Sequence, residues 1–212
     1  AYTLNENLNK LNITTEGYDT AFSAPGKSKR KAIARVQSPY LKDISRRANF
    51  KSNNLYCEAI LKSMGKKYHG EASGQNGIAA IKNMLRKLKI DHKALHMEDG
   101  SGLSARNNVS SNLLAEFLQK MSLNKGTDYT CDLLPKAGYE GTVAGLLKVS
   151  KARGHVWMKS GSMNRVCTYT GIMQDQNGRW KTFCIMINGY DVKYRVMRAR
   201  VEKMVDYIYR YY

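Results

Sequence analysis

Two short polar stretches of the chain carry side chains suited to acyl transfer. They are Ser52-Asn53-Asn54, ahead of an apolar helical pattern, and Lys159-Ser160-Gly161-Ser162, on a strand-like run. Acyl transfer needs an activated nucleophile, a proton relay to the leaving amine, a cation for a substrate carboxylate and hydrogen-bond donors for the oxyanion. The two stretches supply residue types for the last three of these needs.

The first stretch has groups that could serve the leaving amine. The hydroxyl of Ser52 can pass a proton toward a departing nitrogen, and the amide of Asn54, which both donates and accepts, can hold a substrate peptide group. A serine and two asparagines ahead of an apolar run are also typical of a helix N-cap. Taken by itself, the stretch leaves both interpretations open.

The second stretch has groups that could bind a carboxylate and an oxyanion. Lys159 and Ser160 place an ammonium and a hydroxyl side by side, and Gly161 allows a substrate backbone to approach and pair as an added strand. The backbone N–H of Ser162 is then placed to donate to an oxyanion. The alternative is a strand that ends in a polar turn.

Residues from about 38 to 125 carry apolar side chains at helical spacing. We expect one helix to begin at Ser38-Pro39 and to bury Leu41, because these residues satisfy the cap and first-turn preferences. A second helix is expected to begin near Ser52 and to turn Leu55 inward. Further helices are expected at about 74–89 and 110–121.

The last third of the chain is rich in β-branched, aromatic and sulfur-containing side chains. Strands are expected at 156–159, 166–174 and 179–188, and Asn177-Gly178 predicts a hairpin between the last two. An amphipathic helix at about 191–210 follows. Helices, an antiparallel sheet within about 155–188 and a covering helix together predict an α+β fold.

The chain is strongly basic, with 35 Lys and Arg against 17 Asp and Glu, a net charge of +18 and a pI near 9.8. These residues are spread along the sequence apart from Lys27–Lys31, and no zinc-finger, RNA-recognition or KH signature accompanies them, so we expect no nucleic acid as a partner. A basic surface that faces solvent, an anionic wall or a membrane remains open. No stretch approaches the ~20 apolar residues of a membrane-spanning helix, and any export signal is expected upstream of Ala1.

The four cysteines are far apart and form no Cys-x-x-Cys pair, which argues against a metal site. No cofactor is expected. Cys167 and Cys184 fall on the two strands of the expected hairpin, so that a disulfide and two buried thiols both remain open.

Two further stretches join the polar motifs into one ordered pattern. Asp99–Ser110 reads DGSGLSARNNVS, and Leu133–Thr142 reads LLPKAGYEGT. With Ser52-Asn53-Asn54 before them and Lys159-Ser160-Gly161 after them, they resemble the penicillin-binding protein 4 type of D-alanyl-D-alanine carboxypeptidase/endopeptidase, a class C low-molecular-mass penicillin-binding protein. The resemblance runs from about Val36 to Tyr212.

The resemblance implies a serine DD-peptidase or β-lactamase-like fold, an antiparallel sheet flanked by helices, of which residues 1–212 form the C-terminal part of the transpeptidase-like domain and so a partial domain. It implies a hydrolase, a serine protease of the cell wall, that cleaves peptidoglycan stem peptides through an acyl-enzyme and is acylated by β-lactam antibiotics. Such an enzyme is periplasmic or otherwise extracytoplasmic.

Residue roles follow from the same resemblance. They are proton relay for Ser52, binding of the substrate amide for Asn54, a charge near the relay for Lys159, binding of the substrate for Ser160 (its carboxylate) and Gly161, and an oxyanion N–H for Ser162. Ser160 stands where the family has threonine and keeps the hydroxyl. The glycine-rich loop at Asp99–Ser104 is expected to support the site without a catalytic role.

The nucleophilic Ser-x-x-Lys of these enzymes has no convincing counterpart in the chain. The spacing occurs at Ser28/Lys31, Ser63/Lys66 and Ser122/Lys125, and we attribute all three to chance, because the family carries its nucleophile far upstream on a buried helix. We therefore expect the missing N-terminal part of the same enzyme as a partner. The alternative is a catalytically inactive cell-wall or partner-binding protein that retains the scaffold.

Overall fold

The structure is a computed structural model that describes residues 2–18 and 35–212. It divides into two units, Ala1–Ser38 and Pro39–Tyr212. In the first unit, helix α1 (Tyr2–Lys10) precedes a turn, and the ring of Tyr2 lies edge-on to the ring of Tyr18, with the centroids 5.7 Å apart. The Ser28/Lys31 pair lies outside the described residues.

The first part of the second unit is helical. Its α-helices are α2 (Leu41–Lys51), α3 (Asn54–His69), α4 (Gly74–Lys87), α5 (Ser111–Lys125) and α6 (Thr127–Leu133). The side chains of Asn53, Ser73 and Ser110 cap α3, α4 and α5 by accepting backbone N–H groups at 3.0, 3.2 and 3.2 Å. The sequence does not predict α6, because its seven residues, TDYTCDL, have no helical spacing of apolar side chains.

The second part contains an antiparallel sheet with the strand order β1-β2-β3. The strands are β1 (Val156–Met163), β2 (Val166–Gln174) and β3 (Trp180–Asn188), and helix α7 (Tyr194–Tyr211) follows them. The predicted hairpin is present, with Gly178 at a φ of 78°, a conformation that glycine adopts without strain. β1 does not end at Lys159 but continues to Met163, so the polar motif lies within the strand.

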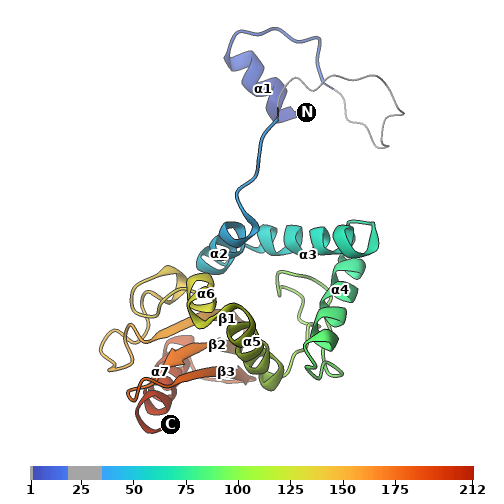
Figure 1. The fold of residues 1–212 in the computed structure, drawn as a ribbon. Coiled ribbons are helices and arrows are strands. Elements are labelled where there is room, and N and C mark those ends of the chain that lie inside the picture. Colours follow the sequence, from blue (N-terminus) through green and yellow to red (C-terminus); the bar gives the residue numbers. More distant parts are fainter. Residues whose placement is uncertain (1, 19–34) are drawn as a thin grey trace. The chain divides into compact units, whose positions relative to one another are not determined.

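Helices cover both faces of the sheet (Figure 1). One face packs against α7 through a cluster that includes Val156, Met158, Tyr169, Met197, Val201 and Val205. The other face packs against α5 and α6 through Leu118, Cys131, Leu134 and Ile172. The α+β fold predicted from the sequence is confirmed.

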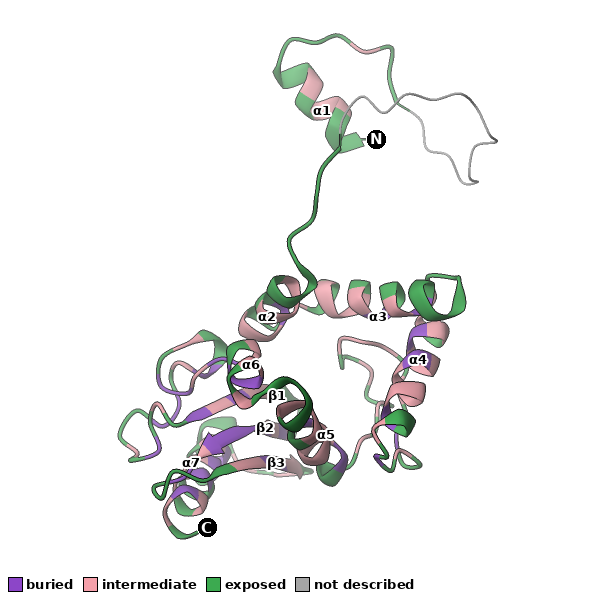
Figure 2. Ribbon diagram, in the orientation of Figure 1, coloured by how far each residue is buried: buried purple, intermediate pink, exposed green. Residues whose placement is uncertain are grey.

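Burial changes along β1, as Figure 2 shows. Val156 and Met158 are fully enclosed, whereas Gly161, Ser162 and Met163 are exposed. The first half of the strand is therefore anchored in the core, and this anchor positions the polar half at the surface.

Two expected core positions in α2 and α3 are wrong. Leu41 is 63% exposed and Leu55 is 73% exposed. Helix α3 packs against α4 through Leu61 and Gly65 instead, because a Cβ on Gly77 of α4 would lie 2.2 Å from the Leu61 carbonyl oxygen. The glycines allow the two helices to approach closely, and this contact sets which face of α3 is buried.

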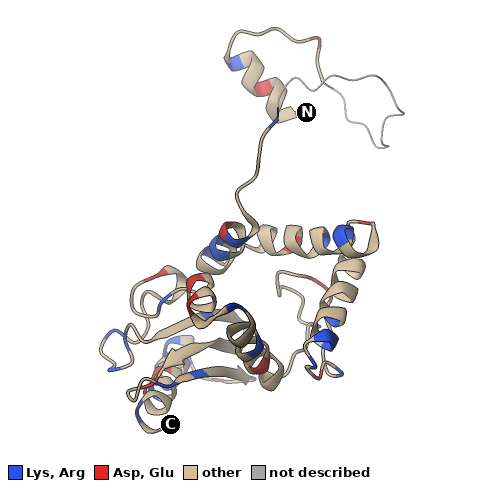
Figure 3. Ribbon diagram, viewed as in Figure 1, with Lys and Arg blue, Asp and Glu red and all other residues tan. Residues whose placement is uncertain are grey.

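Lys and Arg occur on several elements and alternate along the ribbon with acidic residues (Figure 3). Some of this charge is compensated locally, since Lys42 and Arg46 of α2 both pair with Asp132 of α6. These exposed pairs hold α2 against α6 with a small energetic contribution, typically about 0–1 kcal/mol each.

Candidate active site

Ser52 lies in the turn between α2 and α3. It has φ 50° and ψ 51°, a left-handed conformation that costs a non-glycine residue on the order of 1 kcal/mol. The cap of α3 is the next residue, Asn53, whose side chain accepts the N–H of Tyr56. The capping interpretation of the first motif therefore belongs to Asn53, and the hydroxyl of Ser52 does not cap α3.

The two motifs meet at Ser52 and Lys159. The Lys159 ammonium donates a hydrogen bond from Nζ to Ser52 Oγ, 3.0 Å away, and it also contacts the carbonyl oxygen of Ser160. Lys159 reaches this position because Val156 and Met158 fix the first half of β1 in the core. The arrangement places a proton donor against the hydroxyl that the sequence indicates as a relay.

Lys159 is partly desolvated by its surroundings. Burial lowers the pKa of its ammonium below the ordinary value, and the nearby thiol of Cys57 on α3 acts in the opposite direction. Burial likewise raises the pKa of Cys57, which Lys159 opposes. The amine of Lys159 is thus easier to deprotonate than a solvated lysine, which suits a group that exchanges protons with a hydroxyl.

The outward edge of β1 is covered along its first half and open along its second half. Residues 135–137 pair with it, since Ala137 N–H donates to the Val156 carbonyl and Met158 N–H donates to the Pro135 carbonyl, at 2.8 and 3.0 Å. In an antiparallel strand the outward backbone groups recur at every second residue. The N–H groups of Ser160 and Ser162 therefore also face outward, and among the described residues none pairs with them.

The open half of the edge contains the third-motif residues. The Ser160 hydroxyl lies 2.9 Å from the hydroxyl of Thr142, which belongs to the 3-10 helix η1 (Gly141–Val143). A Cβ at Gly161 would lie 2.7 Å from Thr168 Oγ1 on β2, so any larger residue there would require the Thr168 side chain to shift. Thr142 ends the Leu133–Thr142 stretch that carries the resemblance, but the sequence indicates no role for its hydroxyl, since no spacing relates it to Ser160.

Asn54 is the first residue of α3 and is exposed, two positions after Ser52. The structure thus brings Ser52, Lys159 and Ser160 into one group with Asn54 beside it.

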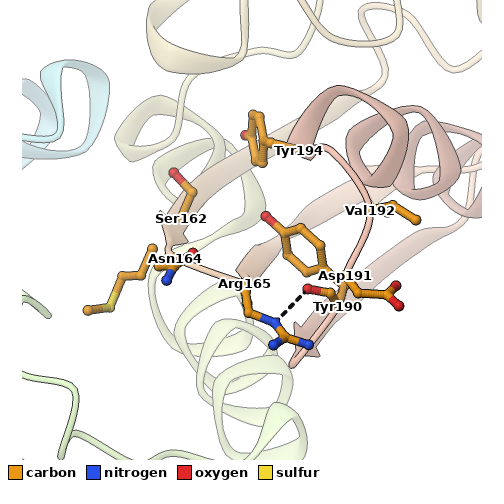
Figure 4. Close-up of a pocket in the computed structure, with 8 residues that line it drawn as sticks. Ser162, Asn164, Arg165, Tyr190, Asp191, Val192 and Tyr194 are labelled. Atoms are coloured by element: carbon orange, nitrogen blue, oxygen red, sulfur yellow. Dashed lines mark hydrogen bonds between the residues drawn. The ribbon is translucent and has the colours of Figure 1, made fainter.

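Beyond Ser162, a cavity of about 580 Å³ lies between the β1–β2 turn and the segment that joins β3 to α7 (Figure 4). Arg165 shapes this cavity by donating hydrogen bonds to the carbonyls of Gly189 and Tyr190, both at 2.9 Å. The lining residues are Ser162, Met163, Asn164, Arg165, Tyr190, Asp191, Val192 and Tyr194. Ser162 therefore belongs both to the open edge of β1 and to the lining of this hollow.

The glycine-rich loop supports α3 directly. The carboxylate of Glu58, on α3, accepts the N–H groups of Gly100 and Ser101 at 2.8 and 2.9 Å. A Cβ on Gly100 would lie 2.8 Å from the Cys57 carbonyl oxygen, so the loop backbone rests against the helix that begins at the Ser52 turn.

Two of the three Ser-x-x-Lys pairs lie within the described residues, on α3 and at the end of α5. Ser63 is exposed on α3, nine residues after Asn54, which is about 13 Å along the helix axis. Ser122, near the end of α5, donates its hydroxyl to the Leu118 carbonyl and contacts Thr130. Both serines have local surroundings unlike those of an activated nucleophile.

All four cysteines are free thiols. Residues 2–18 and 35–212 contain no group of His, Cys, Asp and Glu side chains arranged to hold a metal ion. Over the same residues, none of the helices has the length and apolar character required to cross a membrane.

Known proteins resemble the chain in sequence and structure. A family model described as the D-Ala-D-Ala carboxypeptidase 3 (S13) family matches residues 1–211. The D-alanyl-D-alanine carboxypeptidase DacB of Haemophilus influenzae is 29% identical over 174 residues, which are 79% of this chain and 36% of that protein. The D-alanyl-D-alanine carboxypeptidase of an Actinomadura species is 29% identical over 66% of this chain and 27% of its own length.

The crystal structure of penicillin-binding protein 4 (dacB) from H. influenzae, complexed with a β-lactam, superposes with a TM-score of 0.75 at 26% identity, covering 80% of this chain and 41% of that one. A TLA-1 β-lactamase shares the fold at 16% identity and a TM-score of 0.57, over 80% of this chain and 64% of its own. The chain spans about a third of the length of the curated relatives it matches.

Proposed function

Because the chain belongs to the D-Ala-D-Ala carboxypeptidase 3 (S13) family, we propose that it is the C-terminal part of a serine-type peptidase that cleaves D-Ala-D-Ala peptides of peptidoglycan through an acyl-enzyme. The observation that carries the proposal is the 3.0 Å hydrogen bond from Lys159 to Ser52. This hydrogen bond brings the motif expected to relay a proton to the leaving amine next to the motif expected to bind the substrate carboxylate.

The substrate binds as an extended strand on the open edge of β1. Its terminal carboxylate lies against Ser160 and the positive charge of Lys159, and its scissile carbonyl accepts the outward N–H of Ser162. Asn54, two residues after Ser52, holds the peptide group of the substrate. These contacts fix the carbonyl carbon for attack and stabilise the oxyanion.

The reaction proceeds in two halves. A serine hydroxyl attacks the carbonyl carbon and gives its proton to the lysine of its own Ser-x-x-Lys segment. The C–N bond to the terminal D-Ala breaks, and the departing amine takes a proton that Ser52 relays, so that one proton is taken from the nucleophile and one is given to the leaving group. Lys159 replenishes the hydroxyl of Ser52 through the hydrogen bond that joins them. Water then hydrolyses the ester, which releases the shortened peptide and restores the serine.

The nucleophile comes from a Ser-x-x-Lys segment in the N-terminal part of the same enzyme. Support comes from the surroundings of Ser63 and Ser122, which are an exposed helix face and a helix-end hydrogen bond. A complete enzyme is also acylated by β-lactams, whose strained amide takes the place of the peptide. Its place of action is the extracytoplasmic cell wall.

Labelling with a fluorescent β-lactam tests the proposal. The 212-residue chain alone is expected to form no covalent adduct, and the chain joined to its encoded upstream sequence is expected to form a stable one. An extended protein that also remains unlabelled, and releases no D-Ala from a D-Ala-D-Ala peptide, would reject the peptidase and favour the catalytically inactive wall- or partner-binding protein.

A further inference from the structure

Residues 133–143, here called the bridging segment, contact both elements that carry the motifs. Toward α2, the Asn49 amide donates to the Leu133 carbonyl at 2.9 Å, and a Cβ on Gly141 would lie 2.7 Å from the Phe50 carbonyl oxygen. Toward β1, the segment pairs through Pro135 and Ala137. The bridging segment therefore fixes the spacing between the end of α2, just before Ser52, and the polar half of β1.

A turn within this segment holds Thr142 in place. Glu140 closes it twice, since its N–H donates to the Lys136 carbonyl at 2.9 Å and its carboxylate accepts the Lys136 N–H at 3.0 Å. Gly141 follows with a φ of 53° and is wedged against α2. Val143, on the other side of Thr142, is completely buried. The backbone of Thr142 is thus clamped on both sides, while its side chain is exposed beside Ser160.

The contact between the two hydroxyls constrains the proton of Ser160. A hydroxyl has one proton to donate and lone pairs to accept, and a carboxylate can only accept. When Ser160 donates to a substrate carboxylate, its oxygen is left to accept, and the Thr142 hydroxyl at 2.9 Å is placed to donate to it. A chain of hydrogen bonds in one direction polarises each member and strengthens the terminal bond to the charged group.

We propose that Thr142 is a positioning residue for carboxylate recognition, which orients the Ser160 hydroxyl toward the terminal carboxylate of a peptide or β-lactam. The proposal rests on the proposed function of the site. It assigns a task to the bridging segment, whose sequence marks a family resemblance without indicating a role for this hydroxyl.

The test compares Thr142→Val, which keeps the shape and removes the hydroxyl, with Thr142→Ser, which keeps the hydroxyl, in the enzyme extended by its upstream sequence. For benzylpenicillin, Thr142→Val is expected to lower the second-order acylation rate constant by about five- to tenfold through weaker binding, with the limiting rate at saturation retained. Thr142→Ser is expected to restore the wild-type constant. Thermal unfolding of both variants checks that the fold is kept.

Two controls separate orientation of Ser160 from a general structural effect. The methyl ester of benzylpenicillin has no carboxylate, so Thr142→Val should leave its acylation rate unchanged. In a Ser160→Ala background, Thr142→Val should cause no further loss. Equal rates for wild type and Thr142→Val, or a loss that persists with the ester or in the Ser160→Ala background, would overturn the proposal.

Failure of the proposed function has a different signature. An extended wild-type enzyme that reacts with neither benzylpenicillin nor its ester would overturn the peptidase assignment, and the role of Thr142 with it. A wild-type enzyme that reacts normally, with Thr142→Val reacting equally well, would overturn the role of Thr142 alone.

Discussion

The ammonium of Lys159 lies 3.0 Å from the hydroxyl of Ser52, although the two residues are 107 positions apart in the chain. One residue occupies a strained turn between helices, and the other stands where an edge strand leaves the core. Because these two side chains converge, substitution of either residue is the clearest test of the candidate site.

Removing either partner should slow acylation of the extended enzyme. We expect Lys159→Ala and Ser52→Ala each to lower the rate constant for β-lactam acylation by about 10²- to 10⁴-fold, the usual contribution of a positioned proton-transfer group. Stopped-flow or gel-based labelling measures it. Lys62→Ala, on the exposed side of α3, is the matched control and should label at the wild-type rate. Normal labelling of Ser52→Ala would remove the relay from the mechanism.

The partial burial of Lys159 should affect the pH dependence of the acylation rate. Because burial lowers the pKa of its ammonium, activity that needs the charged form should fall on the alkaline side with a midpoint below the ordinary 10.5. In Lys159→Arg this alkaline limb should vanish, since a guanidinium stays protonated throughout the range. The measurement is the acylation rate from pH 6 to 11. An unchanged limb in Lys159→Arg would assign it to another group.

Asp175 should contribute stability that disappears in acid. Burial opposes ionisation of this carboxyl, but hydrogen bonds from Lys181 and Arg179 outweigh burial and hold its pKa well below the usual range. A lowered folded-state pKa stabilises the fold above the unfolded value of about 3.9, and this contribution is lost as the pH falls below that value. Asp175→Asn should therefore lower the thermal midpoint by several degrees at pH 7 and by progressively less below pH 4.

The control for Asp175 is Asp43→Asn, at an exposed position in the first turn of α2. It should change the midpoint little at either pH. Equal effects of the two substitutions at pH 7 would contradict the role given to the Asp175 hydrogen bonds.

Close packing of α3 on α4 predicts opposite effects for two glycines of the same helix. Gly77→Ala places a Cβ against the backbone of Leu61 and should lower the free energy of unfolding by about 1–3 kcal/mol, the usual cost of overpacking. Gly74→Ala meets nothing within 4 Å and should be neutral or stabilising by up to about 1 kcal/mol. Urea unfolding of both variants measures the difference, and equal stabilities would show that the helices can separate freely.

The meeting of the two polar motifs could be predicted from sequence because each consists of contiguous residues with distinctive chemistry, whereas the catalytic roles of these residues stay predictions. Ser52 and Lys159 were recognised by residue type, and the sheet was recognised from its β-branched strands and the Asn177-Gly178 turn. Thr142 could not be found this way, because its importance comes from a turn closed by Glu140 and from contact with a strand 18 positions later.

The expected burial of Leu55 is wrong, for a related reason, in helix α3. Its apolar side chains suggested that Leu55 is buried, but the contact with α4 is made where glycines remove side-chain bulk. Glycine adds nothing to a hydrophobic pattern. Helices α3 and α4, which pack through Gly65 and Gly77, therefore have their contact faces where the apolar pattern of the sequence is weakest.

The partial cover over the outer edge of β1 has a consequence for any peptide that binds there. Residues 135–137 already occupy the backbone groups of Val156 and Met158, so an incoming chain can form ladder hydrogen bonds only with the residues after them. A peptide threaded along the strand meets a fixed stop, and the distance from that stop to Ser162 is set by the pleat of the sheet. The protein's own backbone thus fixes how many residues of a bound peptide lie between its free end and Ser162.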